Sequence, residues 1–178
     1  MLKFFKVAFF TTTLTIILSS CSTSEKAALD KSSSSMYPEW YSTAEFASDS
    51  TAFHGFATAI SSDSVVAIAN AELQARANLE NAIAYKMEEV RSSLEEGGSS
   101  MVTNSDFILT MRNAHQAVQE AAEKTSGEAR ANDQHFKGFA RVTISKAEFR
   151  ELMKSGFRGK TNYWETFSTS SSFIQEMN

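Results

Sequence analysis

The chain has 178 residues, of which 42% are hydrophobic and 21% charged, and its 17 Lys and Arg against 21 Asp and Glu give a formal net charge of −4. This length suits one ordinary domain with a leader or a tail, and the acidic balance argues against a nucleic-acid-binding protein. The single cysteine excludes a disulfide framework and a cysteine-type zinc site.

Residues 1–20 predict a lipoprotein signal peptide. Two lysines precede an apolar stretch, 7–18, which is shorter than the roughly 20 apolar residues that cross a bilayer. It ends in Leu18-Ser19-Ser20-Cys21, which resembles the lipobox of bacterial lipoproteins. The resemblance implies cleavage between Ser20 and Cys21 and acyl chains such as palmitate at the cysteine, the only soft nucleophile in the chain. An ordinary signal peptide with an incidental Cys21 is the alternative.

Acyl chains on Cys21 would anchor the protein without a spanning helix, because each buried CH₂ contributes about 0.8 kcal/mol. Ser22, rather than Asp, follows the cysteine, and in Gram-negative lipoproteins this implies the outer membrane, on its periplasmic or its surface face. Removal of residues 1–20 leaves 15 basic against 21 acidic residues, a net charge of −6. Such a body is not expected to bind anionic lipid by charge, so the anchor must hold it.

Residues 21–36 contain the lipidated cysteine and a serine-rich run that predicts a flexible tether. The globular domain is predicted for 37–156 and is followed by a serine- and aromatic-rich tail, 157–178. Near the start of the domain, Trp40 and Tyr41 are expected to pack into the core, with ligand stacking or an interface as the alternative.

The periodicity predicts a strand over 52–60, a helix over 63–96 and a second helix over 104–124. Strands at 127–133 and 136–145 follow, and then a short helix that starts at a capping box and ends at Gly156. We therefore expect an α+β fold, in which a small antiparallel sheet of about three strands is packed by a long helical hairpin and a short C-terminal helix.

Two strands have distinct faces. Small residues alternate along 52–60, with Gly55 among them, so a helix can approach closely there. In the strand 136–145 we expect one set of residues to face inward, Phe136, Gly138, Ala140, Val142 and Ile144, and the alternate set to face outward, Lys137, Phe139, Arg141 and Thr143.

In the long helix, one apolar stripe is expected to carry Val65, Ala69, Ile83, Met87, Val90 and Leu94, with Leu73 and Leu79 at its flanks. Glu72, Arg76 and Glu80 stand at four-residue intervals near the centre of this stripe. They form either a solvated, locally neutralised ladder or a buried polar knot that locks an interface.

The chemistry-bearing residues do not form a recognisable catalytic or metal-binding set. The three histidines, His54, His115 and His135, lack partners at metal-ligand spacing, and neither a nucleotide-binding glycine loop nor a serine nucleophile elbow is present. We expect no cofactor and no enzymatic activity; an enzyme acting on envelope polymers is the less favoured alternative. The expected partners are the membrane, through acylated Cys21, and an unknown envelope protein, and homo-oligomers are left open.

Several short motifs of the domain resemble those of the LPP-twenty family of bacterial outer-membrane lipoproteins. The similarity lies in Pro38-Glu39-Trp40-Tyr41, Gly55-Phe56-Ala57-Thr58-Ala59, Ser62-Asp63, Ala71, Ala75-Arg76 and Leu79. The resemblance implies an α+β fold, location in the cell envelope and no enzymatic activity. A similar domain opens the flagellar assembly protein T family, so an assembly or accessory factor for a flagellar or secretion machine is the alternative function.

Overall fold

The computed structural model describes residues 36–178, in which Pro38–Asn178 form one compact unit. The predictions for residues 1–35, among them cleavage at Ser20 and lipidation of Cys21, lie outside the described residues. Within the described part of the chain, no helix combines the length and the apolar character needed to cross a membrane.

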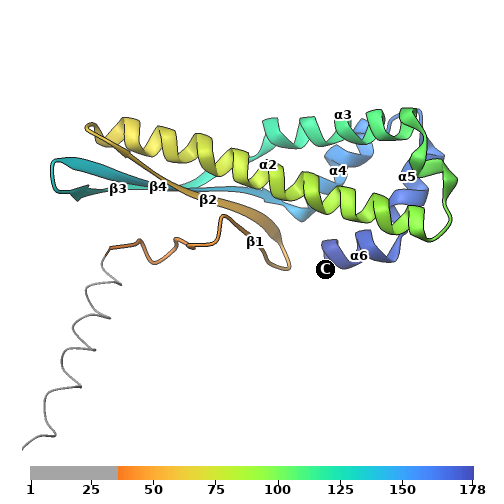
Figure 1. Ribbon diagram of the computed structural model, residues 1–178, viewed down its shortest axis with the longest axis horizontal. Helices are drawn as coiled ribbons and strands as arrows, with labels where there is room; N and C mark the ends of the chain where they lie inside the picture. The colour runs from red at the N-terminus through yellow and green to blue at the C-terminus, as the bar shows by residue number, and fades with distance from the viewer. Residues whose placement is uncertain (1–35) are drawn as a thin grey trace, which may run out of the picture. The chain divides into compact units, whose positions relative to one another are not determined.

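The fold is α+β, which confirms the expected class (Figure 1). Residues 36–178 form five α-helices, a short 3₁₀ helix and a four-stranded antiparallel sheet, in which the strand order is β1-β2-β4-β3. In chain order the elements are β1 (Phe46–Ser48), β2 (Ala52–Ser61), α2 (Ser64–Glu96), η1 (Ser100–Thr103), α3 (Ser105–Ala121), β3 (Glu123–Asn132), β4 (His135–Ser145), α4 (Lys146–Gly156), α5 (Thr161–Ser168) and α6 (Ser171–Met177).

The expected number of about three strands was one too low. The additional strand, β1, pairs with the edge of β2 over only three residues, from Phe46 opposite Gly55 to Ser48 opposite Phe53. Three residues are too few to display the alternation by which a strand is recognised in a sequence.

The boundary between α3 and β3 also differs from the prediction, which ended the helix near residue 124 and began the strand at 127. The backbone turns extended at Ala122, whose N–H closes the last helical turn on the carbonyl of Val118. Ser126 and Gly127 lie inside β3, beside a register shift between Lys124 and Ser126. Alanine is a strong helix former, so its helix propensity favoured a longer helix at Ala122 than the structure has.

The sheet and the first half of α2 are in contact almost backbone to backbone. A Cβ atom added at Gly55 would lie 2.2 Å from the carbonyl oxygen of Ala75, and one added at Gly138 would lie 2.3 Å from that of Ala67. Only hydrogen fits at these two strand positions, as the small-residue face of the first long strand predicted for Gly55.

The buried face of α2 is not the straight stripe that we expected. Its buried residues follow one another at four-residue intervals from Ala67 to Met87, and each such step advances about 40° around a helix of 3.6 residues per turn. The buried row therefore winds by roughly 200°. The prediction is correct for the second half of the helix, where Ile83, Met87 and Val90 are buried.

In the first half of α2 the prediction is wrong. Val65 and Leu73 are 72% and 67% exposed, and Ala69 is exposed as well, whereas the alanines on the other side of the helix are buried: Ala67, Ala71 and Ala75. The sheet's glycines admit small side chains only, so the less hydrophobic face of the helix becomes the interior one.

At the other end of the molecule, the second half of α2 meets α3–α6 around a cluster of phenylalanines (Figure 1). Five of them are fully buried: Phe107, Phe149, Phe157, Phe167 and Phe173. The last three of these phenylalanines belong to residues 157–178, for which a tail was predicted. These residues form α5 and α6 within the same compact unit.

The sheet face opposite α2 is partly covered by the segment that precedes β1, which runs below the sheet in Figure 1. The Tyr41 ring packs edge-on against Phe56 and Phe139, with ring centroids 6.0 and 5.1 Å away. Phe139 does project from the face opposite α2, as alternation requires, but it is completely buried rather than turned to solvent. The expected packing role of Tyr41 accounts for this.

Candidate functional site

Trp40 and Tyr41, two of the residues singled out from the sequence, lie on the face of the sheet opposite α2. Both are half-buried. Trp40 contacts the edge of the Tyr41 ring and has the guanidinium carbon of Arg141 5.9 Å from its own ring centroid. Since Tyr41 packs on the sheet, Trp40 is the partly exposed end of an aromatic stack, with a cation beside it.

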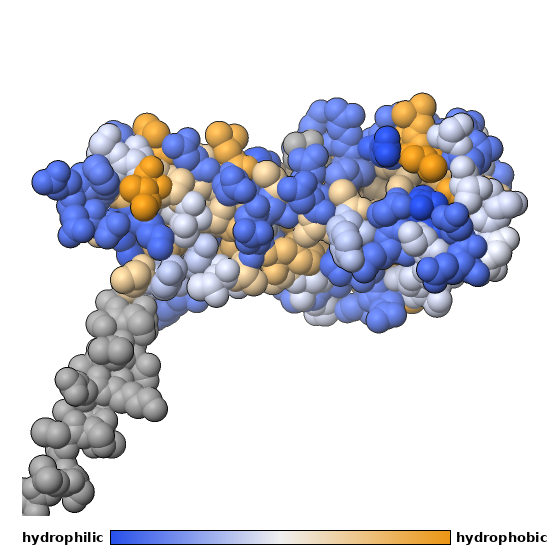
Figure 2. Space-filling view, viewed as in Figure 1, coloured by the Kyte–Doolittle hydropathy of each residue, from blue (hydrophilic) through white to orange (hydrophobic). Residues whose placement is uncertain are grey.

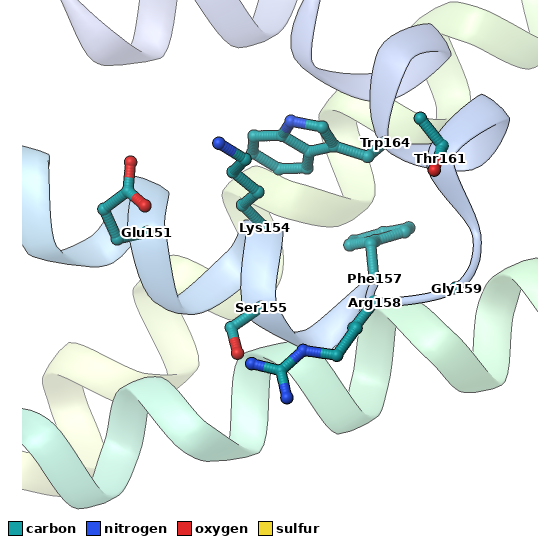
Figure 3. Close-up of a pocket in the computed structure, with 8 residues that line it drawn as sticks. All are labelled: Glu151, Lys154, Ser155, Phe157, Arg158, Gly159, Thr161 and Trp164. Carbon is teal, nitrogen blue, oxygen red and sulfur yellow. The ribbon is translucent and has the colours of Figure 1, made fainter.

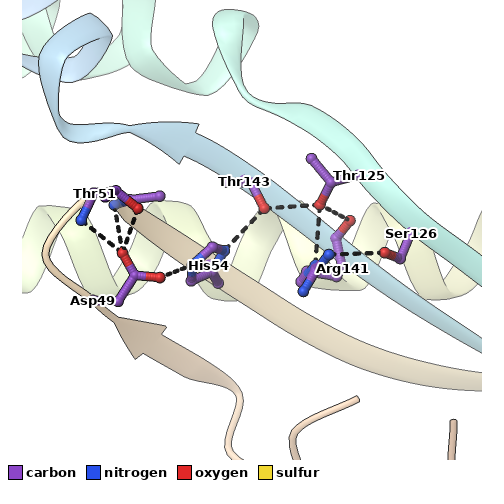
Figure 4. Close-up of polar contacts among 8 residues, drawn as sticks. Asp49, Thr51, His54, Thr125, Ser126, Arg141 and Thr143 are labelled. Carbon is purple, nitrogen blue, oxygen red and sulfur yellow. Dashed lines mark hydrogen bonds and ion pairs between the residues drawn. The ribbon is translucent and has the colours of Figure 1, made fainter. Parts of the chain in front are cut away.

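A chain of polar contacts crosses the same sheet face (Figure 4). His54 on β2 contacts Asp49 through Nε2 at 2.9 Å and Thr143 on β4 through Nδ1 at 3.0 Å. The second carboxylate oxygen of Asp49 accepts hydrogen bonds from the hydroxyl and backbone N–H of Thr51 and from the N–H of Ala52. The hydrogen bond from His54, followed by those from Thr51 and Ala52, holds the pKa of Asp49 well below its usual range.

The chain continues across β4 to β3. The Thr143 hydroxyl lies 2.8 Å from that of Thr125, and Arg141 donates to Thr125 and to the Ser126 hydroxyl. The contacts from aspartate to histidine to threonine follow the order of a hydrolytic triad. The Thr143 hydroxyl also contacts that of Thr125, and together these contacts join the β1–β2 turn to β2, β4 and β3. The arrangement therefore acts as a polar seam across the sheet.

Glu72 and Arg76 form a different cluster on α2, and each has partners beyond the helix. Their side chains pair at 3.0 Å with 23% and 29% exposure, and Glu72 also pairs with Lys124 of β3 at 2.8 Å. Arg76 donates to the carbonyl of Ala122, where α3 passes into β3. Lys124, followed by Arg76, lowers the pKa of Glu72. This half-buried cluster fixes the α3–β3 junction to α2.

Glu80 contributes through its backbone, since its carbonyl lies 3.2 Å from Nε2 of His115 on α3. A cavity of about 10 Å³ lies between this contact and Arg76, which is close to the space that a single water molecule needs. Glu72, Arg76 and Glu80, which were expected to form one ladder, therefore lie at the part of α2 where its buried side stops facing the sheet and begins to face the other helices.

The structure does not bring the two sets of sequence-predicted residues together. Glu72 reaches Lys124 on the α2 side of the sheet, whereas Thr125, the next residue of β3, joins the polar seam on the opposite side. Trp40 and Glu72 are thus separated by the thickness of the sheet. Within residues 36–178, no group of three or more His, Cys, Asp and Glu is placed to hold a metal ion.

A surface that the sequence interpretation missed lies on the first turns of α2. Val65, Val66 and Leu73 are 72%, 47% and 67% exposed, and Ile60 at the end of β2 is 59% exposed. We call these four residues the tip patch; Figure 2 shows separate orange residues, with hydrophilic residues between them, at this end of the molecule. The signal was present in the sequence, because Val65 and Leu73 were recognised as apolar, but they were assigned to the core.

The tip patch adjoins the polar cluster along the helix. Arg76 and Glu80 follow Leu73 on the same side of α2, at spacings of three and seven residues. An apolar surface bordered by partly exposed charged side chains has the composition of a protein interface with its polar rim.

Comparison of the chain with protein-family models, with curated proteins and with solved structures finds no match in any of the three.

Proposed function

We propose that the chain is a non-enzymatic lipoprotein of the bacterial outer membrane, which is anchored through acylated Cys21 and contacts an envelope protein through the tip patch. The single observation that carries the contact surface is the exposure of Val65 and Leu73 on a helix that buries Ala67, Ala71 and Ala75 instead. Large aliphatic side chains in contiguous exposed positions mark sites where proteins meet.

The lipid anchor is supported by the sequence. The only cysteine of the chain directly follows an apolar stretch and two small residues, as in a lipobox. The compact unit begins at Pro38, which leaves the serine-rich residues 22–36 between the anchor and the body. A spacer of this composition gives a reach of roughly 20 Å, enough to hold a domain clear of the lipid headgroups.

The experiment for the anchor is metabolic labelling with a fatty acid, combined with globomycin, which blocks the lipoprotein signal peptidase. We expect label on the wild-type chain, none on Cys21→Ser, and loss of membrane partitioning in the variant. Unchanged partitioning of Cys21→Ser, or an unmodified amino terminus on released wild-type protein, contradicts the anchor.

The experiment for the contact surface is photo-crosslinking in living cells from a reactive residue at position 73. The matched control carries the same reactive residue at Glu89, an exposed position on the second half of α2. A stoichiometric envelope protein captured at 73 and not at 89 supports the proposal, and a flagellar or secretion component would assign the more specific assembly role. Equal capture at both positions, or only a second copy of this chain, contradicts it.

A further inference from the structure

A groove with basic side chains lies along α4, at the end of the molecule away from the tip patch. Lys146, Arg150, Lys154 and Arg158 follow one another at four-residue intervals along α4 and the turn after it. In a helix, each interval advances about 6 Å along the axis. Two hollows open beside this row: one of about 330 Å³ between Lys146, Arg150 and Met177, and one of about 380 Å³ at Lys154 and Arg158.

The second hollow combines cations with aromatic rings (Figure 3). Phe157 and the half-buried Trp164 of α5 line it together with Lys154 and Arg158. In Figure 3 the Lys154 side chain extends toward the indole of Trp164, while the guanidinium of Arg158 turns toward Ser155. Glu151 lines both hollows as well, so the polar wall carries an excess of basic side chains over one carboxylate, and the other wall is aromatic or aliphatic.

These basic residues differ from most others in the domain. Six basic side chains elsewhere are paired with carboxylates, namely Arg76, Lys86, Arg91, Lys124, Arg130 and Lys160. Within residues 36–178 none of the four along the groove forms an ion pair. Lys146 is buried with its ammonium over the ring of Phe53, whereas Arg150, which lies over Phe173, and Lys154 and Arg158 are exposed. The acidic side chains of α4, Glu148 and Glu151, offset only half of the charge of the four.

We propose that the groove along α4 seats the anionic headgroups of the membrane to which Cys21 tethers the protein. The three exposed basic residues of the row are attracted to an anionic lipid surface, and a half-buried tryptophan beside them suits the boundary between headgroups and acyl chains. One acyl anchor and one basic surface together are the usual pair of signals for stable attachment. The net charge of −6 expected for the mature chain conceals this surface, because most of the acidic residues lie elsewhere and only Glu151 lines the two hollows. The inference rests on the proposed anchor.

Trp164 provides a direct probe. The lipidated full-length protein with Trp40→Phe, which leaves Trp164 as the only tryptophan, is reconstituted into vesicles of phosphatidylcholine alone or mixed with phosphatidylglycerol. The lipids are brominated near the headgroup end of the acyl chains, so they quench an indole that touches them. We expect quenching of Trp164 in the anionic vesicles only, and its loss at high salt, which screens charge.

Two variants test the cations. Lys154→Gln with Arg158→Gln should lower the ratio of docked to undocked protein roughly 30-fold, because each basic residue near an anionic surface contributes about fivefold. The control is Arg112→Gln on α3, which removes an exposed charge on the side of that helix opposite Ala114, the residue that contacts Gly156 of α4. It should leave the quenching unchanged, and circular dichroism establishes that each variant is folded.

The anchor and the groove fail in different ways. Failure of the protein to float with neutral vesicles contradicts the anchor, and the groove is then measured by adding the same protein to an excess of anionic vesicles. Flotation without quenching in anionic vesicles overturns the groove, as do equal quenching in neutral vesicles and quenching that survives removal of the two charges.

Discussion

The two halves of α2 are packed against their neighbours by opposite means. Toward the sheet, alanines lie against strand positions where only a hydrogen atom fits, at Gly55 and Gly138. Toward α3–α6, larger aliphatic side chains lie against a cluster of phenylalanine rings with centroids 5–6 Å apart, such as Phe167 and Phe173 at 5.2 Å. The first contact fixes the distance between two backbones, whereas the second fills a volume that side chains can share.

The largest effect is expected from one methyl group in the sheet contact. In Gly138→Ala the new Cβ would lie 2.3 Å from backbone atoms of Ala67, so α2 itself would have to move. We expect the free energy of unfolding to fall by more than about 3 kcal/mol, beyond the usual cost of overpacking. The control, Gly127→Ala, places its Cβ 3.1 Å from the Cγ2 methyl of Ile68 and near no backbone atom, so a small side-chain adjustment relieves the contact. Urea denaturation measures both, and equal losses would contradict the contrast.

A smaller loss is expected when several atoms are removed from the phenylalanine cluster. Phe167 is completely buried beside Phe107, Phe157 and Phe173. Phe167→Leu keeps an apolar side chain and loses three ring contacts worth about 0.5–1.5 kcal/mol each beyond their area. Because leucine keeps part of the packing, we expect a loss near the lower end of their sum, about 2 kcal/mol. A loss greater than that of Gly138→Ala, measured in the same urea titration, would reverse the comparison.

The junction between the halves should be less sensitive still. Arg76→Met removes the donor to the Ala122 carbonyl and one partner of Glu72, which keeps Lys124. We expect a loss of about 1 kcal/mol, typical of one net hydrogen bond. The same substitution at the exposed Arg112 should stay within about 0.5 kcal/mol. Indistinguishable denaturation midpoints for the two variants would show that the cluster does not stabilise the junction.

The smallest effect is expected at a surface contact, and it depends on pH. Asp106 at the start of α3 accepts from Lys160 at 2.5 Å and from the Tyr163 hydroxyl at 3.1 Å, and these bonds, Lys160 first, lower the pKa of Asp106. A lowered pKa stabilises the fold above the unfolded value, near 3.9, and this stabilisation is lost as pH falls through the folded value.

The variant Asp106→Asn should therefore be less stable than the wild type at neutral pH, and the difference should shrink below about pH 4. Urea titrations of both proteins at a series of pH values provide the measurement. A difference that stays constant down to the acid limit would mean that the carboxylate charge of Asp106 contributes nothing.

The sequence was sufficient for the fold class and for most elements, because strong periodicity and capping residues are local properties. Ser145 caps α4 through the N–H of Glu148, as the capping box predicts, and Asp63 caps α2 through the N–H groups of Val65 and Val66. The boundary at Ala122 was not predictable in this way, since it depends on how β3 pairs with β4. The short strand β1 exists only because the edge of β2 is present to pair with it.

The surfaces were harder to predict than the fold. Val65 and Leu73 were recognised as apolar, but the winding of the buried row around α2 depends on which neighbour each turn meets. The groove along α4 could have been found from the spacing of its basic residues. The net charge of the whole chain is negative, however, and does not reveal a local excess of basic residues. Its aromatic wall comes from α5, whose position no local pattern specified.

The entry of the chain into the folded body has a mechanical consequence. Force applied at the amino end would reach the body at Pro38, then at the packed rings of Trp40 and Tyr41, and then at β1, whose three residues pair with a single neighbour at the sheet's edge. Under tension, the backbone pairs between β1 and β2 would break one after another rather than all at once. The long helix and the inner strands would bear load only after β1 had separated from β2. The short edge strand would therefore unfold first and protect the rest of the domain from the force.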